Sequence, residues 1–142
     1  MKDTLEAQVI IKASREKVLE VWVKEEYVKI WNVPFEDWHC PTVINEVRTG
    51  GSFDFRMEKK DGSEGFNYKG EYTFVVPNER IELLQEDGRK SVIHFKEQDG
   101  NIAVIEQFEP EEKTELGLQV EFCQSILNKF KACVEDELQW ED

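Results

Sequence analysis

The segment TELGLQVEFCQSILNKFKACVEDELQ, residues 114–139, determines the predicted fold. Apolar residues recur in it every three or four positions, which is the spacing of one face of an α-helix. At about 24 residues such a helix is ~36 Å long and spans a small domain. Its apolar stripe must be covered by the rest of the chain. The stripe consists of Leu116, Val120, Cys123, Leu127, Phe130, Val134 and Leu138.

The chain before this segment supplies strands to cover it. Apolar and polar residues alternate with a period of two, as is typical of half-buried β-strands, most regularly in FNYKGEYTFVV at 66–76. The Asp-Gly pairs at 87–88 and 99–100 predict tight hairpin turns between consecutive strands. We therefore expect strands at 5–12, 42–48, 53–58, 66–76, 80–86, 91–97 and 102–109.

Two short helices are predicted between the first and second strands. Ser14 is a suitable N-cap for a helix at about 15–24, and apolar spacing predicts a second helix at 25–31. Together the elements predict one α+β domain over residues 1–142. About seven antiparallel strands and one long helix can bury their apolar faces only if the sheet curls around the helix. A hollow left between them would be a site for a small ligand.

The composition disfavours several functional classes. The chain has 18 Lys and Arg against 31 Asp and Glu, a formal net charge of −13, so a nucleic acid partner is not expected. No apolar run approaches the ~20 residues of a membrane span. The N-terminal residues lack the features of a secretory signal, so we expect a cytoplasmic location. The three Cys and two His show no metal-ligand spacing, and we expect neither a metal nor another cofactor.

Several local patterns resemble one known family. Ala13–Val18 resembles its A-p-r-e-k-V helix start, and Gly50–Phe53 resembles its GG-x-f/w turn. Phe66–Pro77 resembles its f-x-G-x-y-x-x-v-x-P strand, and Gln124 and Glu135 fit its C-terminal helix. The family is that of homologues of the activator of the heat-shock-chaperone ATPase, the AHSA-like family of the SRPBCC, or START-like, superfamily.

This resemblance implies a helix-grip fold, in which a curled antiparallel sheet surrounds the long C-terminal helix. The superfamily includes lipid carriers, hormone receptors and polyketide cyclases. The resemblance and the expected hollow together predict a soluble binding protein for a small hydrophobic or amphipathic molecule. A chaperone or another protein as partner, and a role in the stress response, follow from the family resemblance alone. The family often has Trp where Cys123 stands, so this chain would leave more room there.

The candidate ligand-binding residues are mainly apolar and aromatic side chains expected between the sheet and the long helix. Tyr68 and Tyr72 are informative because a buried phenol needs a partner from a ligand, water or the protein. The segment Phe35–Cys40 is expected to form a loop over the cavity mouth, with Phe35 and Trp38 as lid residues. No catalytic set is expected. The candidates are Trp31, Phe53, Phe55, Tyr68, Tyr72, Phe74, His94, Cys123, Ile126 and Phe130.

Two polar strand residues leave an alternative open. With two-residue turns at both Asp-Gly pairs, Ile93 faces Glu106 across one hairpin and His94 faces Ile81 across the other. Both faces are partly apolar, so the pattern does not decide which face is internal. An internal His94 or Glu106 would be a ligand anchor, or the acid–base group of a cyclase or hydrolase. Otherwise both are solvated strand residues, and a further alternative is an acidic surface that docks a basic protein.

Overall fold

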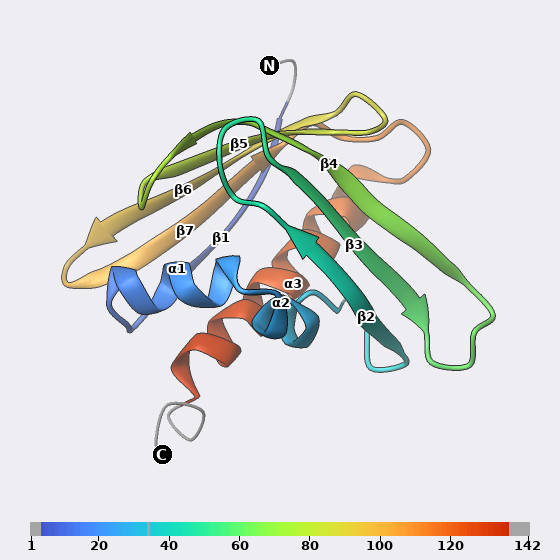
Figure 1. Ribbon diagram of the computed structural model, residues 1–142, viewed down its shortest axis with the longest axis horizontal. Helices are drawn as coiled ribbons and strands as arrows, with labels where there is room; N and C mark the ends of the chain where they lie inside the picture. The colour runs from blue at the N-terminus through green and yellow to red at the C-terminus, as the bar shows by residue number, and fades with distance from the viewer. Residues whose placement is uncertain (1–3, 34, 137–142) are drawn as a thin grey trace.

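One antiparallel sheet and one long helix form the frame of the molecule (Figure 1). The computed structural model describes residues 4–33 and 35–136, so the predicted helix end at Gln139 and its Leu138 lie outside the described residues. In chain order the elements are β1 (Leu5–Ile11), α1 (Arg15–Val23), α2 (Glu25–Trp31), β2 (Trp38–Asn45), β3 (Ser52–Lys59), β4 (Gly65–Val76), β5 (Arg80–Gln85), β6 (Lys90–Gln98), β7 (Asn101–Phe108) and α3 (Leu116–Glu135).

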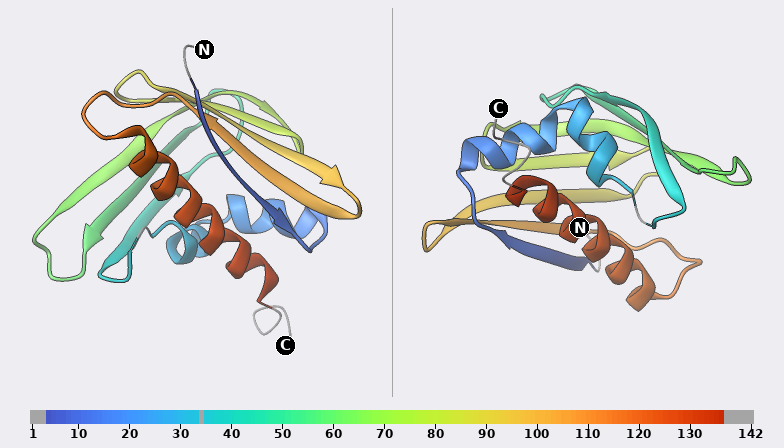
Figure 2. Two further views of the ribbon diagram at one scale, coloured as in Figure 1. Left: turned by 180° about the vertical axis from the view of Figure 1, so that it is seen from behind. Right: turned by 90° about the horizontal axis from the view of Figure 1, so that it is seen from below.

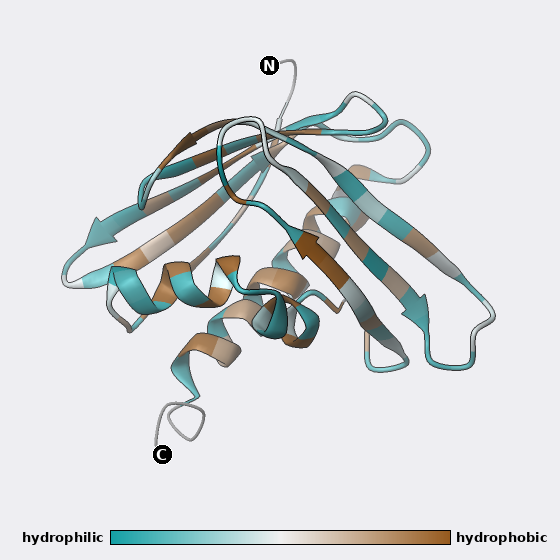
Figure 3. Ribbon diagram, in the orientation of Figure 1, coloured by the Kyte–Doolittle hydropathy of each residue, from teal (hydrophilic) through white to brown (hydrophobic). Residues whose placement is uncertain are grey.

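The seven strands are ordered β1-β7-β6-β5-β4-β3-β2, and every neighbouring pair is antiparallel. Figures 1 and 2 show the sheet curling around α3, with α1 and α2 on the same side of the sheet. Hydrophobic and hydrophilic residues alternate along the strands in Figure 3, as a sheet with one buried face requires. The predicted curled sheet and both predicted short helices are confirmed.

The two Asp-Gly pairs form different turns. At Asp99-Gly100 both φ angles are positive, 51° and 83°, and the two residues alone connect Gln98 to Asn101. At Asp87-Gly88 only the glycine has a positive φ, 94°. There the Gln85 amide donates to the Arg89 carbonyl at 2.8 Å, which closes a three-residue loop. The prediction of a two-residue turn was therefore confirmed at the second pair and wrong at the first.

This extra loop residue decides which face of β5 is internal. Ile81 lies opposite Ile93, and His94 lies opposite Arg80 instead of Ile81. A shift of one residue moves every side chain of a strand to the other face. Ile81 and Ile93 are consequently both buried on the concave face. His94 points to the convex face of the sheet, so this candidate ligand-binding residue does not line the interior, and the alternative of a solvated strand residue applies.

A bulge in β4 has a similar effect on Phe74. The register of β4 against β5 shifts between Tyr72 and Phe74, which leaves Thr73 as the extra residue. Tyr72 stays buried, whereas Phe74 turns to the convex face with 43% of its surface exposed. The Arg80 guanidinium lies 5.3 Å from the centroid of the Phe74 ring. The expectation that Phe74 lies inside was wrong, because one inserted residue reverses the alternation.

Helix α3 also protects an edge of the sheet. Strand β1 pairs only on one side, with β7. On its other side, the Gln124 side chain accepts from the Gln8 amide at 3.3 Å and donates to the Gln8 carbonyl at 2.9 Å. The Lys12 amide donates to Glu135 Oε2 at 2.8 Å. These two helix residues thus occupy backbone groups that would otherwise be open to another strand.

Candidate functional site

At one end of the concave face, the protein fills the space between sheet and helices with its own side chains. Trp22 stacks on Trp31 with ring centroids 4.9 Å apart. Phe95 and Phe130 pack edge-on against Trp22 at 5.6 and 5.0 Å. The Trp31 indole donates to the Val21 carbonyl at 2.9 Å. We refer to Trp22, Trp31, Phe95 and Phe130 as the closed end, which includes two of the predicted ligand-binding residues.

Three more of the predicted residues lie in the same packed core. Phe53 lies 5.7 Å from Phe55 and 5.1 Å from Tyr72, measured between ring centroids. The Tyr72 hydroxyl donates to Asn45 Oδ1, and the Asn45 amide donates to the Val23 carbonyl at 3.0 Å. Burial raises the pKa of Tyr72. This phenol therefore has its partner within the protein and joins β4 to β2 and to the end of α1.

Tyr68 differs from Tyr72 although both lie on the concave face of β4. Its ring packs on Phe53 and Phe55, with centroids 5.0 and 5.9 Å apart. Within residues 4–33 and 35–136, its hydroxyl has no hydrogen-bond partner. The Tyr68 side chain is only partly buried, so this hydroxyl is accessible to a partner from outside the chain. The Tyr68 hydroxyl can therefore form a hydrogen bond with a ligand, whereas the Tyr72 hydroxyl is already bonded to Asn45.

Glu106 lies close to Tyr68 on the same face. It is opposite Ala7 on β1 and Ile93 on β6, both of which are buried. Its carboxyl group is hydrogen-bonded to the Cys123 thiol of α3. We refer to Tyr68, Glu106 and Cys123 as the Glu106 cluster. All three side chains are partly covered, and each comes from a different element: β4, β7 or α3.

The pKa values of the Glu106 cluster reflect its position inside the protein. Burial raises the pKa of Glu106 to about 7, and the hydrogen bond from Cys123 opposes this rise. The pKa of Tyr68 is raised well above its ordinary value, first by burial and next by Glu106. The pKa of Cys123 is raised by the same two causes. Glu106 is thus the member of the cluster that can exchange a proton near neutral pH.

Exposed aromatic side chains lie beside the Glu106 cluster. Phe66 is two residues from Tyr68 on β4, and Phe122 precedes Cys123 on α3. Their exposed fractions are 43% and 37%. Trp38 lies 5.9 Å from Phe66 and Phe35 lies 6.2 Å from Phe122, between ring centroids. We refer to Phe35, Trp38, Phe66 and Phe122 as the aromatic rim.

The structure changes the prediction for the segment Phe35–Cys40, which contains two residues of the aromatic rim. Only its first residues precede β2, which begins at Trp38, so the prediction of a loop through Cys40 was wrong. Cys40 is buried, whereas the neighbouring His39 places Nε2 3.2 Å from Glu58 Oε1. Adjacent strand residues point to opposite faces, which separates these two groups.

The rim stays exposed because α3 does not lie over the β3–β4 hairpin. Figures 1 and 2 show α3 following β1 and passing α1 and α2, while the β3–β4 hairpin extends away from it. The inner face of this hairpin therefore lacks a helix over its outer part. We refer to this region, which contains the Glu106 cluster and the aromatic rim, as the open end. Of the predicted residues, Tyr68, Cys123 and the partly buried Ile126 lie on or near it.

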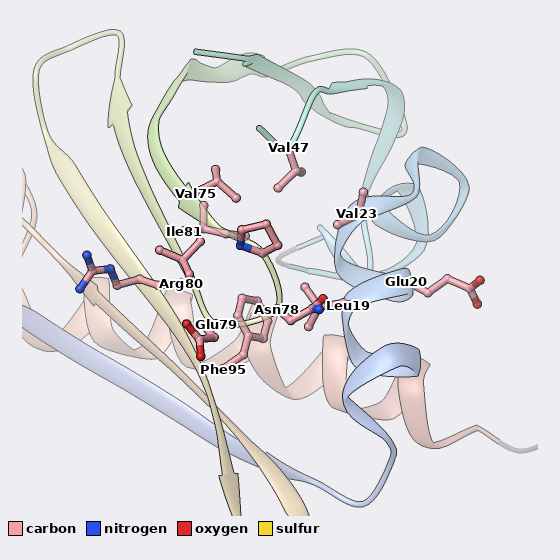
Figure 4. Close-up of a pocket in the computed structure, with 12 residues that line it drawn as sticks. Leu19, Glu20, Val23, Val47, Val75, Asn78, Glu79, Arg80, Ile81 and Phe95 are labelled. Carbon is pink, nitrogen blue, oxygen red and sulfur yellow. The ribbon is translucent and has the colours of Figure 1, made fainter. Parts of the chain in front are cut away.

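A separate recess lies toward the opposite end of β4. It is bounded by α1, the β2–β3 connection and the turn from β4 to β5, and has a volume of about 260 Å³ (Figure 4). That volume is below the ~300–1,000 Å³ typical of small-molecule sites. Sequence reasoning missed this recess because the β4 bulge sends Val75 toward it. Its apolar lining includes Leu19, Val23, Val47, Val75, Ile81 and Phe95.

The described residues carry few other chemical groups of note. No set of three or more His, Cys, Asp or Glu among them is arranged to hold a metal ion. No helix within the described ranges is long and apolar enough to cross a membrane. A carboxyl group with a pKa near 7 suits proton transfer. Its two neighbours in the Glu106 cluster, however, have raised pKa values and remain neutral at that pH.

Solved structures with the same architecture place the chain among known proteins. The AHSA1-like protein from Aeromonas hydrophila has a TM-score of 0.86 and 29% identity, and the match covers 96% of each chain. A protein from Cytophaga hutchinsonii has a TM-score of 0.79 and 34% identity over 98% of this chain and 95% of that one. A protein from Rhodobacter sphaeroides has a TM-score of 0.81 at 11% identity, over 98% and 93%, and supports the fold alone.

Sequence similarity gives the same result. No curated protein is significantly similar to the chain. The family model described as Activator of Hsp90 ATPase homolog 1-like protein matches residues 12–135, which is most of the sequence. The helix-grip architecture and the AHSA1-like structural relatives agree with that match. The chain therefore belongs to the family of Activator of Hsp90 ATPase homolog 1-like proteins, with a fold of the SRPBCC type.

Proposed function

We propose that the protein binds a small amphipathic molecule at the open end, between β4, β7 and α3. The observation that carries this proposal is the placement of exposed aromatic rings beside a partly buried carboxyl group and an unpaired phenol, Tyr68, as judged within the described residues. A ligand with an apolar body and a polar end would cover the exposed rings and offer a partner to the carboxyl and hydroxyl groups.

The aromatic rim supplies the apolar part of this site. Covering an aromatic side chain removes apolar surface from water and contributes about 25 cal/mol per Å². Phe66 and Phe122 lie on opposite sides of the open end, on β4 and α3, and both are substantially exposed. A ligand between them would cover both rings. Exposed apolar patches of this kind commonly mark binding sites.

The closed end limits the size of the ligand. Trp31 is 3% exposed and Phe130 is fully buried, so the protein itself occupies the deeper part of the concave face. The proposed ligand is consequently small, and it lies at the mouth of the fold. Trp31, Phe53, Phe55, Tyr72 and Phe130 then support the site from behind without contacting the ligand.

Binding of the neutral fluorescent probe N-phenyl-1-naphthylamine tests this proposal. We expect its fluorescence to increase on wild-type protein, and its affinity to fall about tenfold in Phe66→Ala and Phe122→Ala. The matched control is Phe74→Ala, because Phe74 is equally exposed but lies on the convex face. Absence of probe binding, or an equal loss in the control, would contradict the proposal.

A second candidate partner is a chaperone or another protein, as the family description suggests. The observation that favours it is the net charge of −13, which suits a basic partner surface. Such binding should weaken steeply with salt because exposed charges are screened. A pull-down with a chaperone at low and high salt tests it, and binding insensitive to salt would contradict a charge-driven contact.

A further inference from the structure

We propose that the ligand carries a positively charged amine at its polar end, bound by the Glu106 carboxylate next to Tyr68 and the aromatic rim. This inference rests on the proposed function and adds the chemical class of the ligand.

Glu106 lacks a cationic partner among the described residues. The titratable groups that face it are Cys123 from α3 and Tyr68 from β4, and both are neutral at physiological pH. Its neighbours on β1 and β6 are the apolar Ala7 and Ile93. A thiol is only a weak hydrogen-bond donor. An ionised carboxylate in these surroundings is poorly compensated, and an ammonium group would supply the missing charge.

The rings around Glu106 also suit a cation. A positive charge is attracted to the faces of Trp, Tyr and Phe within about 6 Å of the ring centroid, and alkylammonium groups are recognised in this way. Tyr68 interacts with Glu106, Phe66 is two residues from Tyr68 on β4, and Phe122 precedes Cys123 on α3. In such a site, an ammonium group would be neutralised by the carboxylate and would also contact the aromatic rings.

An anionic polar end is disfavoured by the charges of the site. The basic residue that interacts electrostatically with Tyr68 is Arg89. Its Nε lies 2.8 Å from Asp87 Oδ2, and its Nη2 donates to Gln85 at 3.1 Å. Arg89 is therefore already engaged. A ligand carboxylate would meet Glu106 without a free cation, on a protein with a net charge of −13.

Competition against bound N-phenyl-1-naphthylamine, with three ligands of equal chain length, tests the inference. Decylamine, decanol and decanoate share one apolar tail and differ in their head groups. At pH 8 we expect decylamine to bind wild-type protein about tenfold more tightly than decanol, and decanoate to bind most weakly. At pH 5.5 the preference for decylamine should shrink, because Glu106 is then protonated while the amine stays charged.

Two variants assign the preference to Glu106. Glu106→Gln should lose the preference for decylamine over decanol. Glu71→Gln removes the same charge from an exposed position on β4 and should retain the preference. Equal binding of decylamine and decanol, or an equal loss in both variants, would overturn the inference. Failure of the neutral probe to bind at all would overturn the proposed function as well, so the two failures are distinguishable.

Discussion

Both ends of the concave face contain aromatic residues, but these are packed together at the closed end and exposed at the open end. At the closed end, three aromatic rings pack on Trp22 with centroids within 6 Å, and the Trp31 indole has a partner in the backbone. At the open end, aromatic rings are exposed, and the Tyr68 hydroxyl has no partner in the described part of the chain. Composition is therefore a poor guide to which aromatic residues bind a ligand. The coverage by α1, α2 and α3 decides it.

The largest expected effect comes from breaking the closed end. Trp31→Ala removes a buried ring that contacts Trp22 and Phe130, and it leaves a cavity. We expect it to lower the free energy of unfolding by about 3–5 kcal/mol. Urea denaturation measures this value. Trp38→Ala, at the aromatic rim, should cost less than about 1 kcal/mol. Similar losses in both variants would contradict the distinction between the two ends.

The two tyrosines of β4 give a sharper comparison, because both changes remove only a hydroxyl group. Tyr72→Phe leaves Asn45 Oδ1 without its donor and should cost about 1–3 kcal/mol of unfolding free energy. Tyr68→Phe should change stability by less than about 0.5 kcal/mol, because no described partner is lost. Thermal and urea unfolding of both variants check this prediction. A larger loss for Tyr68→Phe would show that its hydroxyl is bonded within the protein.

The titration of Glu106 should be visible in the pH dependence of stability. Its pKa is about 7 in the folded protein against 4.5 in the unfolded chain, so the folded state binds more protons between these values. Stability should therefore fall as pH rises from about 4.5 to about 7. The full shift corresponds to at most ~3 kcal/mol, and partial solvent access reduces the expected change to roughly 1–2 kcal/mol.

Glu106→Gln isolates this contribution. The variant should match the wild type at pH 4 and be more stable than it by roughly 1–2 kcal/mol at pH 8. Urea unfolding at the two pH values measures the difference, with Glu71→Gln as the exposed control. A constant difference between variant and wild type across this pH range would contradict the position of Glu106 on the concave face.

A small effect on stability is also expected at the aromatic rim. Phe122→Ala removes a ring that contacts Phe35 but is 37% exposed. We expect it to change the free energy of unfolding by at most about 1 kcal/mol while it weakens probe binding. Measuring both quantities on one preparation separates the two roles. A large loss of stability would place Phe122 in the core.

Much of this fold could be predicted from the sequence, because periodicity reports local structure directly. The helices at Arg15–Val23 and Glu25–Trp31 and the order of the strands follow from apolar spacing and turn residues. The pairing of Ile93 with Glu106 also follows from the two-residue turn at Asp99-Gly100. For this reason Glu106 could be identified in advance as a possible internal polar group.

The remaining placements could not be predicted, because single residues decide them. An identical Asp-Gly pair at 87–88 takes a three-residue loop, and this reverses the face of β5 relative to β6, so that His94 lies opposite Arg80 instead of Ile81. The inserted Thr73 likewise reverses the face of Phe74. Neither event changes the pattern of residue types along the chain. Whether an aromatic residue lies in the core or at the rim depends on the path of α3. The periodicity of the sequence does not reveal that path.

Amide chemical-shift changes measured by NMR, on addition of decylamine or the neutral probe, locate the bound ligand directly. We expect changes concentrated around Tyr68, Glu106 and Phe122, with the amides of Trp31 and Phe130 little affected. Changes centred on the recess between α1 and the β4–β5 turn, or no saturable changes at all, would contradict a binding site at the open end.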